Sequence, residues 1–483
     1  MTAASPTHLL AAALGNGPDH RPALRGSHLV FSGDRLGHAV EAVGRELDAQ
    51  FAPGSRVLLA TRDQLVFALL FLGSLRSGVM PLLADPTDDD RLRALAQRWG
   101  AGGGVGNAAC AAGLGTLSDD ATLRIAASDA RLPLRIPALP TDEAAFWTFT
   151  SGTTGESRAI VHGHGGPQAA FEAFGRGVLG LCAQDRTIAT AGLPFVYALG
   201  NALLFPLMAG ATAILPRDLL LPSVLSALAS ERATVLVSGP RSLDAIERLA
   251  RRDSWQDALR GLRHVLSAGE SLPPALALRW KEHLGGEVLD NLGCTEMFNS
   301  FASSRPGETR PGTLGEILPG FEARIDGRPL RPGLRGALSV RGASRALAIS
   351  DRAGNPPQPP DTEFCETGDE VEITSDRQIV FLGRLDDRFK VQGQFLHPLE
   401  VERALADIPG VVEILVEERR DERGLPAVGL RVVAETGSAE ATIRERLRRH
   451  ARTLIPGRLS ADAVSFVDAL PRSPRGKLLR HAS

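Results

Sequence analysis

"FTSGTTGESR", from Phe149 to Arg158, is the segment that decides how the rest of this chain is interpreted. Its glycines leave backbone N–H groups free to surround an anion, and Arg158 adds a cation at its end. Further donors are the hydroxyl groups of Thr150, Ser151, Thr153 and Thr154. The spacing G-x-x-x-x-G-K-[ST] of a Walker loop is absent, which excludes a P-loop NTPase. The composition therefore predicts a phosphate-binding loop, with a plain glycine–threonine turn between strands as the alternative.

Short apolar runs alternate with helical patterns on both sides of this loop. The runs are "RVLLAT" from Arg56, "VMPLLAD" from Val79, "TVLVSG" from Thr234 and "HVLSAG" from His264. This alternation is typical of βαβ units, so we expect an α/β fold of mainly parallel sheets covered by helices. After residues 383–386 the pattern changes to helix, strand, strand and helix. Because 483 residues exceed one compact core, we predict a large domain over 1–382 and a small α+β domain over 387–483.

The bulk composition excludes several classes of protein. The formal net charge is -2, from 54 basic and 56 acidic residues, which does not indicate nucleic acid or an anionic membrane as a partner. Four cysteines stand singly and no signal peptide is evident, so we expect a reduced, cytoplasmic protein. Arg76 interrupts the apolar stretch from Leu65 to Ala84, which favours a buried helix running into a strand over a membrane span. His162 and His164 lack a cysteine or carboxylate neighbour, and we predict no metal site there.

The loop resembles the signature loop of the adenylate-forming superfamily, which includes acyl- and aryl-CoA synthetases, carrier-loading adenylation domains and luciferases. Five further segments resemble its other signatures, in the family's order. They are "SAGE" (267–270), "NLGCTEMF" (291–298), "ETGD" (366–369), "GRLDDRFKVQG" (383–393) and "PRSPRGK" (471–477). The resemblance covers nearly the whole chain. It implies a large N-terminal domain that includes a small β-barrel subdomain, and a mobile C-terminal domain.

The resemblance also implies a role for individual residues. Thr295 would meet the α-phosphate, Glu296 would hold Mg²⁺, and Lys477 would bridge the carboxylate and the α-phosphate. Arg384 would contact the nucleotide and Asp386 would be the hinge. Lys390 and Gly393 would border the tunnel for the thiol. The residues predicted to contact ATP or AMP are Thr150, Ser151, Gly152, Thr153, Thr154, Gly155, Arg158, Ala268, Gly269, Glu270, Asn291, Leu292, Gly293, Cys294 and Asp369.

Several positions depart from the family pattern without removing a catalytic group. Arg158 replaces the usual lysine of the phosphate loop, and arginine still donates to phosphate. Leu292 stands where many members have a tyrosine that stacks on adenine, so an aliphatic contact is expected there.

The stretch from Leu193 to Leu215 resembles the acid-binding segment of benzoate-type aryl-CoA ligases. Tyr197, the only tyrosine of the chain, offers a flat wall with a polar tip that suits a planar aryl acid. The alternative is that it packs the start of a helix. The predicted acid contacts are Phe195, Tyr197, Ala198, Gly200, Gly239 and Phe298.

The resemblance implies an ATP-dependent acid:thiol ligase that forms an aryl-adenylate and then a thioester with coenzyme A. ATP, Mg²⁺ and coenzyme A, or the phosphopantetheine of a carrier protein, are the implied cofactors. One alternative is an enzyme that loads an aryl acid on a separate acyl or peptidyl carrier protein. Another is a non-catalytic nucleotide-binding homologue. A small carboxylic acid is the expected partner of a monomer or homodimer, and the ring substituents are not encoded in any motif.

Overall fold

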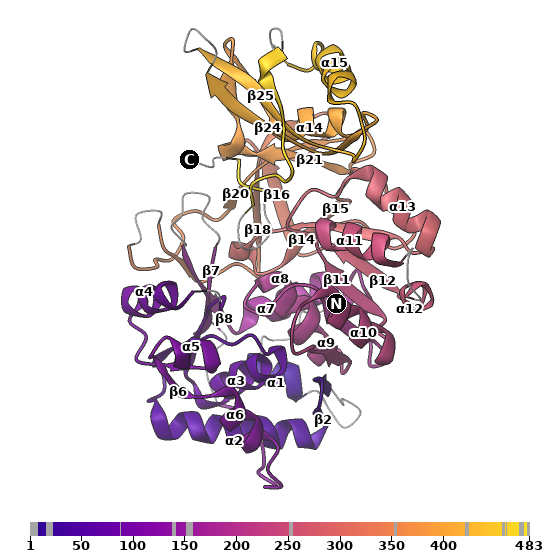
Figure 1. Cartoon of the computed structure of the whole chain (residues 1–483). Helices are drawn as coiled ribbons and strands as arrows, with labels where there is room; N and C mark the ends of the chain where they lie inside the picture. The colour runs from indigo at the N-terminus through magenta and orange to yellow at the C-terminus, as the bar shows by residue number, and fades with distance from the viewer. Residues whose placement is uncertain are drawn as a thin grey trace. The chain divides into compact units, whose positions relative to one another are not determined.

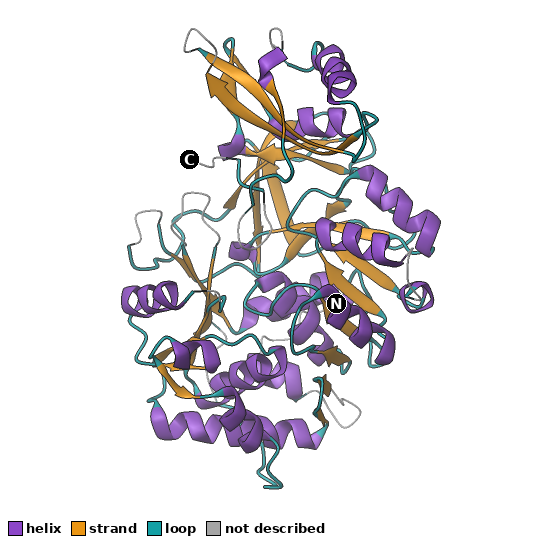
Figure 2. Cartoon of the chain, viewed as in Figure 1, coloured by secondary structure: helices purple, strands orange, loops and turns teal. Residues whose placement is uncertain are grey.

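The computed structural model describes residues 8–15, 23–86, 88–137, 142–150, 158–250, 255–351, 355–420, 425–455, 459, 461–472 and 478–480. The chain divides into two compact units, each of which is considered by itself. The first comprises residues 1–322 and 340–365, and the second comprises residues 323–339 and 366–483. Figure 1 follows the chain through them by colour, and Figure 2 marks their helices and strands.

A seven-stranded sheet forms one half of the first unit. Its order is β19 (Ala348–Ile349), β8 (Ala159–Gly163), β7 (Ala144–Phe149), β4 (Met80–Leu83), β3 (Arg56–Leu59), β5 (Gly104–Val105) and β6 (Gly115–Leu117). The strands from β7 to β6 run parallel, and β8 and β19 are antiparallel additions at one edge. The helices of this part are α1 (Leu9–Leu14), α2 (Asp34–Gln50), α3 (Gln64–Ser77), α4 (Asp89–Trp99), α5 (Asn107–Ala111) and α6 (Asp119–Ala126).

A nine-stranded sheet forms the other half. Its order is β15 (Glu316–Ile317), β14 (Ser300–Ser303), β13 (Val288–Gly293), β12 (His264–Ser267), β11 (Val235–Ser238), β9 (Arg186–Ala189), β10 (Thr212–Ile214), β1 (Ala23–Arg25) and β2 (Val30–Ser32). The six strands from β13 to β1 are parallel. Its helical elements are α7 (Gly165–Ala170), η1 (Phe171–Arg176), α8 (Val196–Ala198), η2 (Leu199–Leu204), α9 (Phe205–Met208), α10 (Leu221–Ser230), α11 (Pro240–Ala250), α12 (Gln256–Arg260), α13 (Pro274–Leu284) and η3 (Thr295–Met297). The predicted helix-covered, mainly parallel sheets are therefore confirmed.

Helix α3 shows why the two halves share one core. Every residue of α3 is buried, so its apolar sequence packs on all sides. Asp63 caps its start by accepting hydrogen bonds from the N–H groups of Leu65 and Val66, and Gly78 ends it with φ 73°. Arg76, the one charge in the apolar stretch, pairs with Glu41 at 2.6 Å. Burial alone would raise the pKa of Glu41, but the hydrogen bonds from Arg76 and Arg45 lower it to about 2.

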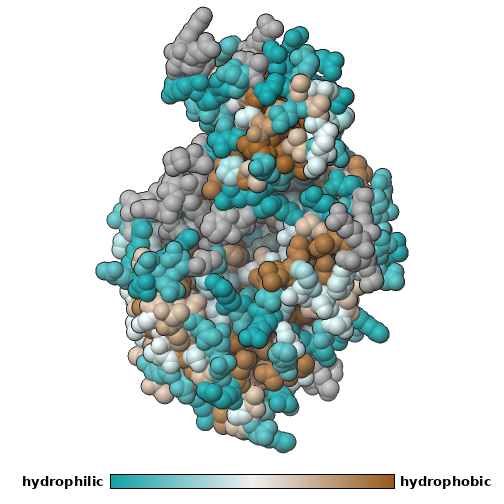
Figure 3. All heavy atoms as spheres, viewed as in Figure 1, coloured by the Kyte–Doolittle hydropathy of each residue, from teal (hydrophilic) through white to brown (hydrophobic). Residues whose placement is uncertain are grey.

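The predicted buried helix and following strand are thus confirmed as α3 and β4. Among the described residues, no helix combines the length and the apolar character that a membrane crossing needs. Hydrophilic side chains cover much of the face seen in Figure 3, with smaller hydrophobic groups between them.

The second unit is built on a five-stranded sheet, in the part of the chain predicted to hold a small barrel. Its order is β17 (Arg328–Pro329), β16 (Phe321–Ile325), β18 (Arg335–Gly342), β20 (Cys365–Ile373) and β21 (Ile379–Arg384). The later elements are η4 (Leu385–Asp387), β22 (Phe389–Val391), β23 (Gln394–Leu396), α14 (Pro398–Ala406), β24 (Val411–Arg420), β25 (Pro426–Ala434), α15 (Glu440–Ala451), η5 (Ala461–Ala463) and β26 (Val464–Phe466). The predicted order of helix, strand, strand and helix is confirmed here.

The boundary between the units differs from the domain boundary that we predicted. Residues 323–339 and 366–382 group with the C-terminal residues, whereas we assigned them to the large domain. The predicted hinge at 383–386 lies inside the second unit, where β21 ends and η4 begins. The hinge itself stays a prediction.

Candidate active site

The phosphate loop lies between two antiparallel strands of the first unit. Thr150 follows β7 and Arg158 precedes β8, and the N–H of Thr150 donates to the carbonyl of Arg158 at 3.0 Å. The N–H of Arg158 in turn donates to Oγ1 of Thr150 at 3.2 Å. These two bonds close the base of the loop. The predicted contacts Ser151, Gly152, Thr153, Thr154 and Gly155 lie outside the described residues.

Arg158 and Glu296 form an ion pair although 138 residues separate them in the chain. Glu296 belongs to η3 and is 8% exposed. Residues 344–346 hold the backbone of η3 in place. The N–H of Ala346 donates to the carbonyl of Glu296 at 2.8 Å. Oγ of Ser344 donates to the carbonyl of Met297 at 2.9 Å. The structure thus brings the predicted phosphate-binding cation and the predicted Mg²⁺ ligand together.

The predicted nucleotide contacts of the nine-stranded sheet, together with the predicted acid contact Gly239, cluster at the carboxyl ends of its parallel strands, where α/β sheets commonly bind ligands. Gly239 follows β11, and residues 268–270 follow β12. The N–H of Ala268 donates to the carbonyl of Ser238 at 3.3 Å, which holds these two turns side by side. Leu292 and Gly293 end β13. Gly239, Ala268, Gly269, Glu270, Leu292, Gly293, Cys294 and Thr295 all keep exposed surface, whereas Asn291 is buried.

The predicted acid contacts divide into accessible and buried residues. Phe195 and Tyr197 are half-buried, so each residue keeps some accessible surface. Its hydroxyl oxygen is buried and has no partner at hydrogen-bond geometry among the described residues, although it lies near Asn291. Burial and the nearby Asp290 carboxylate raise the pKa of Tyr197 well above its usual value, and Asn291 opposes them.

Ala198 and Phe298 are fully buried, each with 0% exposure, and Gly200 is buried as well. A Cβ at Gly200 would collide with Nδ2 of Asn299, so this glycine makes room for a protein side chain. The Phe298 ring contacts the rings of Phe146 and His162. Their contact with an acid stays a prediction, and the neighbours that the structure gives them are core residues.

The two histidines near β8 are buried. Nε2 of His162 lies 3.0 Å from Oγ1 of Thr148, and burial lowers the pKa of His162 to about 3. His164 packs on the ring of His8 with ring centroids 4.0 Å apart, and burial lowers the pKa of His164 to about 3. Both rings are therefore neutral at physiological pH. The described residues contain no group of three or more histidine, cysteine or carboxylate side chains suited to a metal ion.

Asp369 and Arg384 meet in the second unit. They are register partners on β20 and β21, and Nη1 of Arg384 donates to Oδ1 of Asp369 and to the carbonyl of Thr367, each at 2.7 Å. Gly368 has φ 73°, and a Cβ there would lie 2.7 Å from Nη2 of Arg384. Asp369 is 4% exposed, and Arg384 holds one of its carboxylate oxygens in place.

The residues after the predicted hinge form a small hairpin. Lys390 lies on β22, and its Nζ is 4.7 Å from the ring centroid of Phe395 on β23. Phe395 is 60% exposed, and our sequence analysis missed it. Gly393 turns the hairpin with φ 82°. Asp386 lies in η4, and Lys477 lies outside the described residues.

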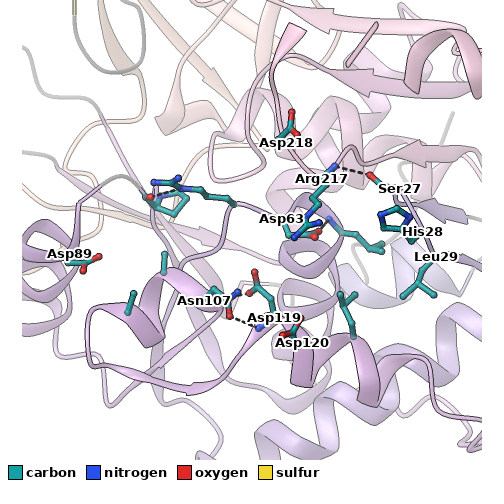
Figure 4. A pocket seen from close by; sticks show the side chains of 16 residues that line it. Ser27, His28, Leu29, Asp63, Asp89, Asn107, Asp119, Asp120, Arg217 and Asp218 are labelled. Carbon is teal, nitrogen blue, oxygen red and sulfur yellow. Dashed lines mark hydrogen bonds between the residues drawn. The ribbon is translucent and has the colours of Figure 1, made fainter. Parts of the chain in front are cut away.

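A separate cavity of about 620 Å³ opens in the first unit at the carboxyl ends of β3, β5 and β6 (Figure 4). It contains none of the predicted site residues. Its carboxylates already serve the fold: Asp63 caps α3, and Asp119 accepts hydrogen bonds from Oγ1 of Thr61 at 2.7 Å and from the N–H of Asn107 at 2.8 Å. Burial raises the pKa of Asp119. Asp63 and Asp119, two of the carboxylates that line the cavity, are therefore used by hydrogen bonds within the fold.

Comparison with known proteins identifies the family. Residues 10–348 match the family described as AMP-binding enzyme, and residues 400–477 match the AMP-binding enzyme C-terminal domain. The benzoate–CoA ligase of Thauera aromatica is 30% identical over 93% of this chain and 90% of its own length. The p-hydroxybenzoic acid–AMP ligase FadD22 of Mycobacterium tuberculosis is 34% identical over 96% of this chain, which spans 66% of that relative's length.

A solved structure agrees with these relatives. The anthranilate CoA ligase AuaEII, crystallised with anthranoyl-AMP, superposes with a TM-score of 0.87 at 25% identity and covers 99% of this chain and 96% of its own. The family match covers well over half of the chain, and the matched range includes both Arg158 and Glu296. The chain therefore belongs to the adenylate-forming family of AMP-binding enzymes, with aryl-CoA ligases among its relatives.

Proposed function

We propose that this chain activates an aryl carboxylic acid as its acyl-adenylate and transfers the acyl group to a thiol. The observation that carries the proposal is the pairing of Arg158 with Glu296 beside the phosphate loop. An ion pair of this kind, next to a loop rich in donors, is suited to exchange its internal partner for a phosphate and its counter-ion. The benzoate–CoA ligase relative supports the aryl class of acid.

In the first half-reaction a carboxylate oxygen attacks the α-phosphorus of ATP and pyrophosphate leaves. Negative charge grows on the phosphate oxygens during the attack, and fixed cations and N–H donors stabilise it. Arg158 would turn from Glu296 to the phosphates, and Thr295 would donate to the α-phosphate. Glu296 would then be free to hold Mg²⁺, which needs one or two carboxylates and otherwise takes phosphate and water oxygens. The bound ion would supply positive charge to the phosphates.

The second unit would hold the ribose and complete the reaction. Asp369 is suited to accept both ribose hydroxyl groups because Arg384 already fixes one of its oxygens. Lys477 would bridge the carboxylate and the α-phosphate during adenylation. Rotation at Asp386 would withdraw Lys477 and bring Lys390 and Gly393 to the thiol. Motions of this kind are commonly absorbed by a few residues between rigid parts.

Coenzyme A is the thiol that we propose, and a carrier-protein phosphopantetheine is the second candidate. The relative from Thauera aromatica is named as a CoA ligase, whereas FadD22 is named as an acid–AMP ligase. Each name thus supports a different fate for the adenylate.

The test is a pyrophosphate-release assay with ATP and a panel of acids that includes benzoate, hydroxybenzoates, aminobenzoates and octanoate. We expect release with at least one aryl acid and none with octanoate. A Glu296→Gln variant should lose the signal, because the amide cannot replace the carboxylate as a magnesium ligand. Release with octanoate and with no aryl acid would contradict the proposal.

A further inference from the structure

Asn299 lies at the junction between the segment that carries Tyr197 and the loop that carries Glu296. It lies between η3 and β14, separated from the end of η3 by Phe298, and it is 2% exposed. Phe298, the residue before it, has φ 64°, a positive value that residues other than glycine rarely adopt. Strain of this kind persists only where the surrounding structure enforces it. Here it turns the chain from η3 into β14 and directs Asn299 into the interior.

The Asn299 side chain makes contacts in two directions. Nδ2 donates to the carbonyl of Val196 at 3.1 Å, and Val196 is the residue before Tyr197. Oδ1 accepts from Nδ2 of Asn201 at 3.1 Å and from the N–H of Ser300 at 2.9 Å. Nδ2 of Asn201 also donates to the carbonyl of Tyr197 at 3.0 Å. The two amides therefore hold the carbonyl groups of Val196 and Tyr197 from one side.

The backbone around these carbonyl groups is irregular. Leu199–Leu204 form the π-helical turn η2, in which backbone pairing shifts by one residue from that of the preceding α-helix. Such turns are infrequent and recur at functional sites. Asn201 and Asn299 supply hydrogen bonds to carbonyl groups at this shift, and thereby fix the place of Tyr197 along the helix.

Two glycines make room for Asn299. A Cβ at Gly200 would collide with Nδ2 of Asn299, which is not free to move because it is already hydrogen bonded. A Cβ at Gly293 would collide with the backbone carbonyl oxygen of Asn299. Gly200 belongs to the acid segment and Gly293 to the end of β13, so Asn299 is packed tightly between them.

We propose that Asn299 is a positioning residue that sets the acid-binding segment around Tyr197 against the Thr295–Glu296 loop. This inference rests on the proposed function, since it assigns Tyr197 to the acid and Glu296 to the nucleotide. Asn299 itself touches neither substrate in this role. Its effect is to keep the wall of the acid site in place against the Thr295–Glu296 loop, so loss of Asn299 should weaken binding of the acid and leave binding of ATP nearly unchanged.

The first experiment compares Asn299→Ala with the wild-type chain in adenylation kinetics, using whichever acid the wild type activates best. The KM for the acid should rise by about tenfold or more, while the KM for ATP stays within about twofold. Asn107→Ala is the control, because it removes a side-chain amide of the same unit that lies at the separate cavity and whose Oδ1 accepts from the N–H of Asp119 at 3.0 Å. It should leave both constants near the wild-type values.

The second experiment uses Gly200→Ala, which displaces the Asn299 amide without removing it. Alone it should raise the KM for the acid, as Asn299→Ala does. In the Asn299→Ala background the added methyl group has space. The fold-increase in the acid KM of the double variant should therefore be at least about fivefold smaller than the product of the fold-increases of the two single variants. Gly73→Ala is the control for a methyl group forced into the core, since its Cβ would lie 2.6 Å from Cγ1 of Val43. It should lower Tm without changing the KM for the acid.

The outcomes separate this inference from the proposed function. If the wild type releases pyrophosphate with no aryl acid, the proposed function fails, and the acid that it does use still tests Asn299. If Asn299→Ala raises the two KM values equally, or if the effects of Gly200→Ala and Asn299→Ala simply multiply, Asn299 is only a structural residue and the inference is overturned.

Discussion

Glu370 offers the sharpest test of how the second unit is held together, through the variant Glu370→Gln. The carboxylate is 6% exposed and accepts from Nε of Arg335 at 2.8 Å, from Nη1 of Arg388 at 3.1 Å and from Nε2 of His397 at 2.7 Å. Glu370 and Arg335 precede the predicted hinge, and Arg388 and His397 follow it. Any rotation at Asp386 would therefore have to break this cluster.

The magnitude follows from the burial of the partners. Arg335 and Arg388 keep 43% and 30% of their side-chain surface exposed. Because water screens their charges, we assign them a smaller part of the stabilisation. His397 is buried and makes the shortest contact. We expect Glu370→Gln, which keeps the shape and removes the charge, to lower the free energy of unfolding of this unit by about 1–3 kcal/mol at pH 7.

The pH dependence supplies a second signature. Burial alone would raise the pKa of Glu370, but the hydrogen bond from Arg335 and the charge of His397 hold it below its usual value. A carboxyl group whose pKa is lower in the folded state than in the unfolded state stabilises the fold at pH values above its unfolded pKa, which is about 4.3. This contribution is lost as the pH falls through the pKa of the folded state. The difference between wild type and Glu370→Gln should therefore shrink below about pH 4.

The assay is amide hydrogen exchange of β20 and α14 in the full chain, at pH values on both sides of this range. Glu372→Gln is the matched control, because Glu372 lies on the same strand and is less buried. It should change stability by less than about 0.5 kcal/mol. Equal protection in the two variants at pH 7, or a difference that does not depend on pH, would refute the reasoning.

Three further predictions address the reaction. Lys477→Ala should slow adenylation by about 10²–10³-fold while thioester formation from supplied acyl-AMP survives, and equal loss in both half-reactions would contradict the assigned role. Asp386→Pro should keep adenylation and reduce thioester formation because proline fixes φ, and wild-type rates in both steps would show that Asp386 is not the pivot. Asp369→Asn should raise the KM for ATP by about tenfold, through loss of a charge-assisted bond to ribose, and leave the KM for the acid unchanged; an unchanged KM for ATP would remove Asp369 from the ribose site.

Local patterns were enough to predict the helix-covered, mainly parallel sheets, and the resemblance to a family pointed to the motif residues. The buried helix α3 and the strand β4 follow from one apolar stretch with a capping aspartate and a terminal glycine, so no distant residue was needed. Arg158 and Glu296 were both identified from the motifs that contain them. Their ion pair joins residues 138 positions apart, and only the arrangement of β7, β8 and η3 brings them into contact.

Residues whose importance depends on distant neighbours could not be predicted in this way. Asn299 has an ordinary polar side chain beside a motif, and its role arises from contacts with η2 on another part of the chain. Phe298 was predicted to contact the acid; its ring packs on Phe146 and His162, a contact between residues far apart in the chain that the motif does not indicate, and its contact with an acid stays a prediction. Glu370 follows Asp369 in the sequence, and nothing local indicates that His397 and Arg388 converge on it.

The claim that an acid oxygen attacks the α-phosphorus of ATP can be tested by isotope transfer. The chain would be given an aryl acid labelled with ¹⁸O in its carboxylate, together with ATP, Mg²⁺ and a thiol acceptor, and the nucleotide product would be analysed by mass spectrometry. If the acyl-adenylate forms and the thiol then attacks its carbonyl carbon, the bridging oxygen leaves with AMP, so AMP carries one ¹⁸O atom per thioester. Unlabelled AMP, or ADP with the label in inorganic phosphate, would contradict the claim.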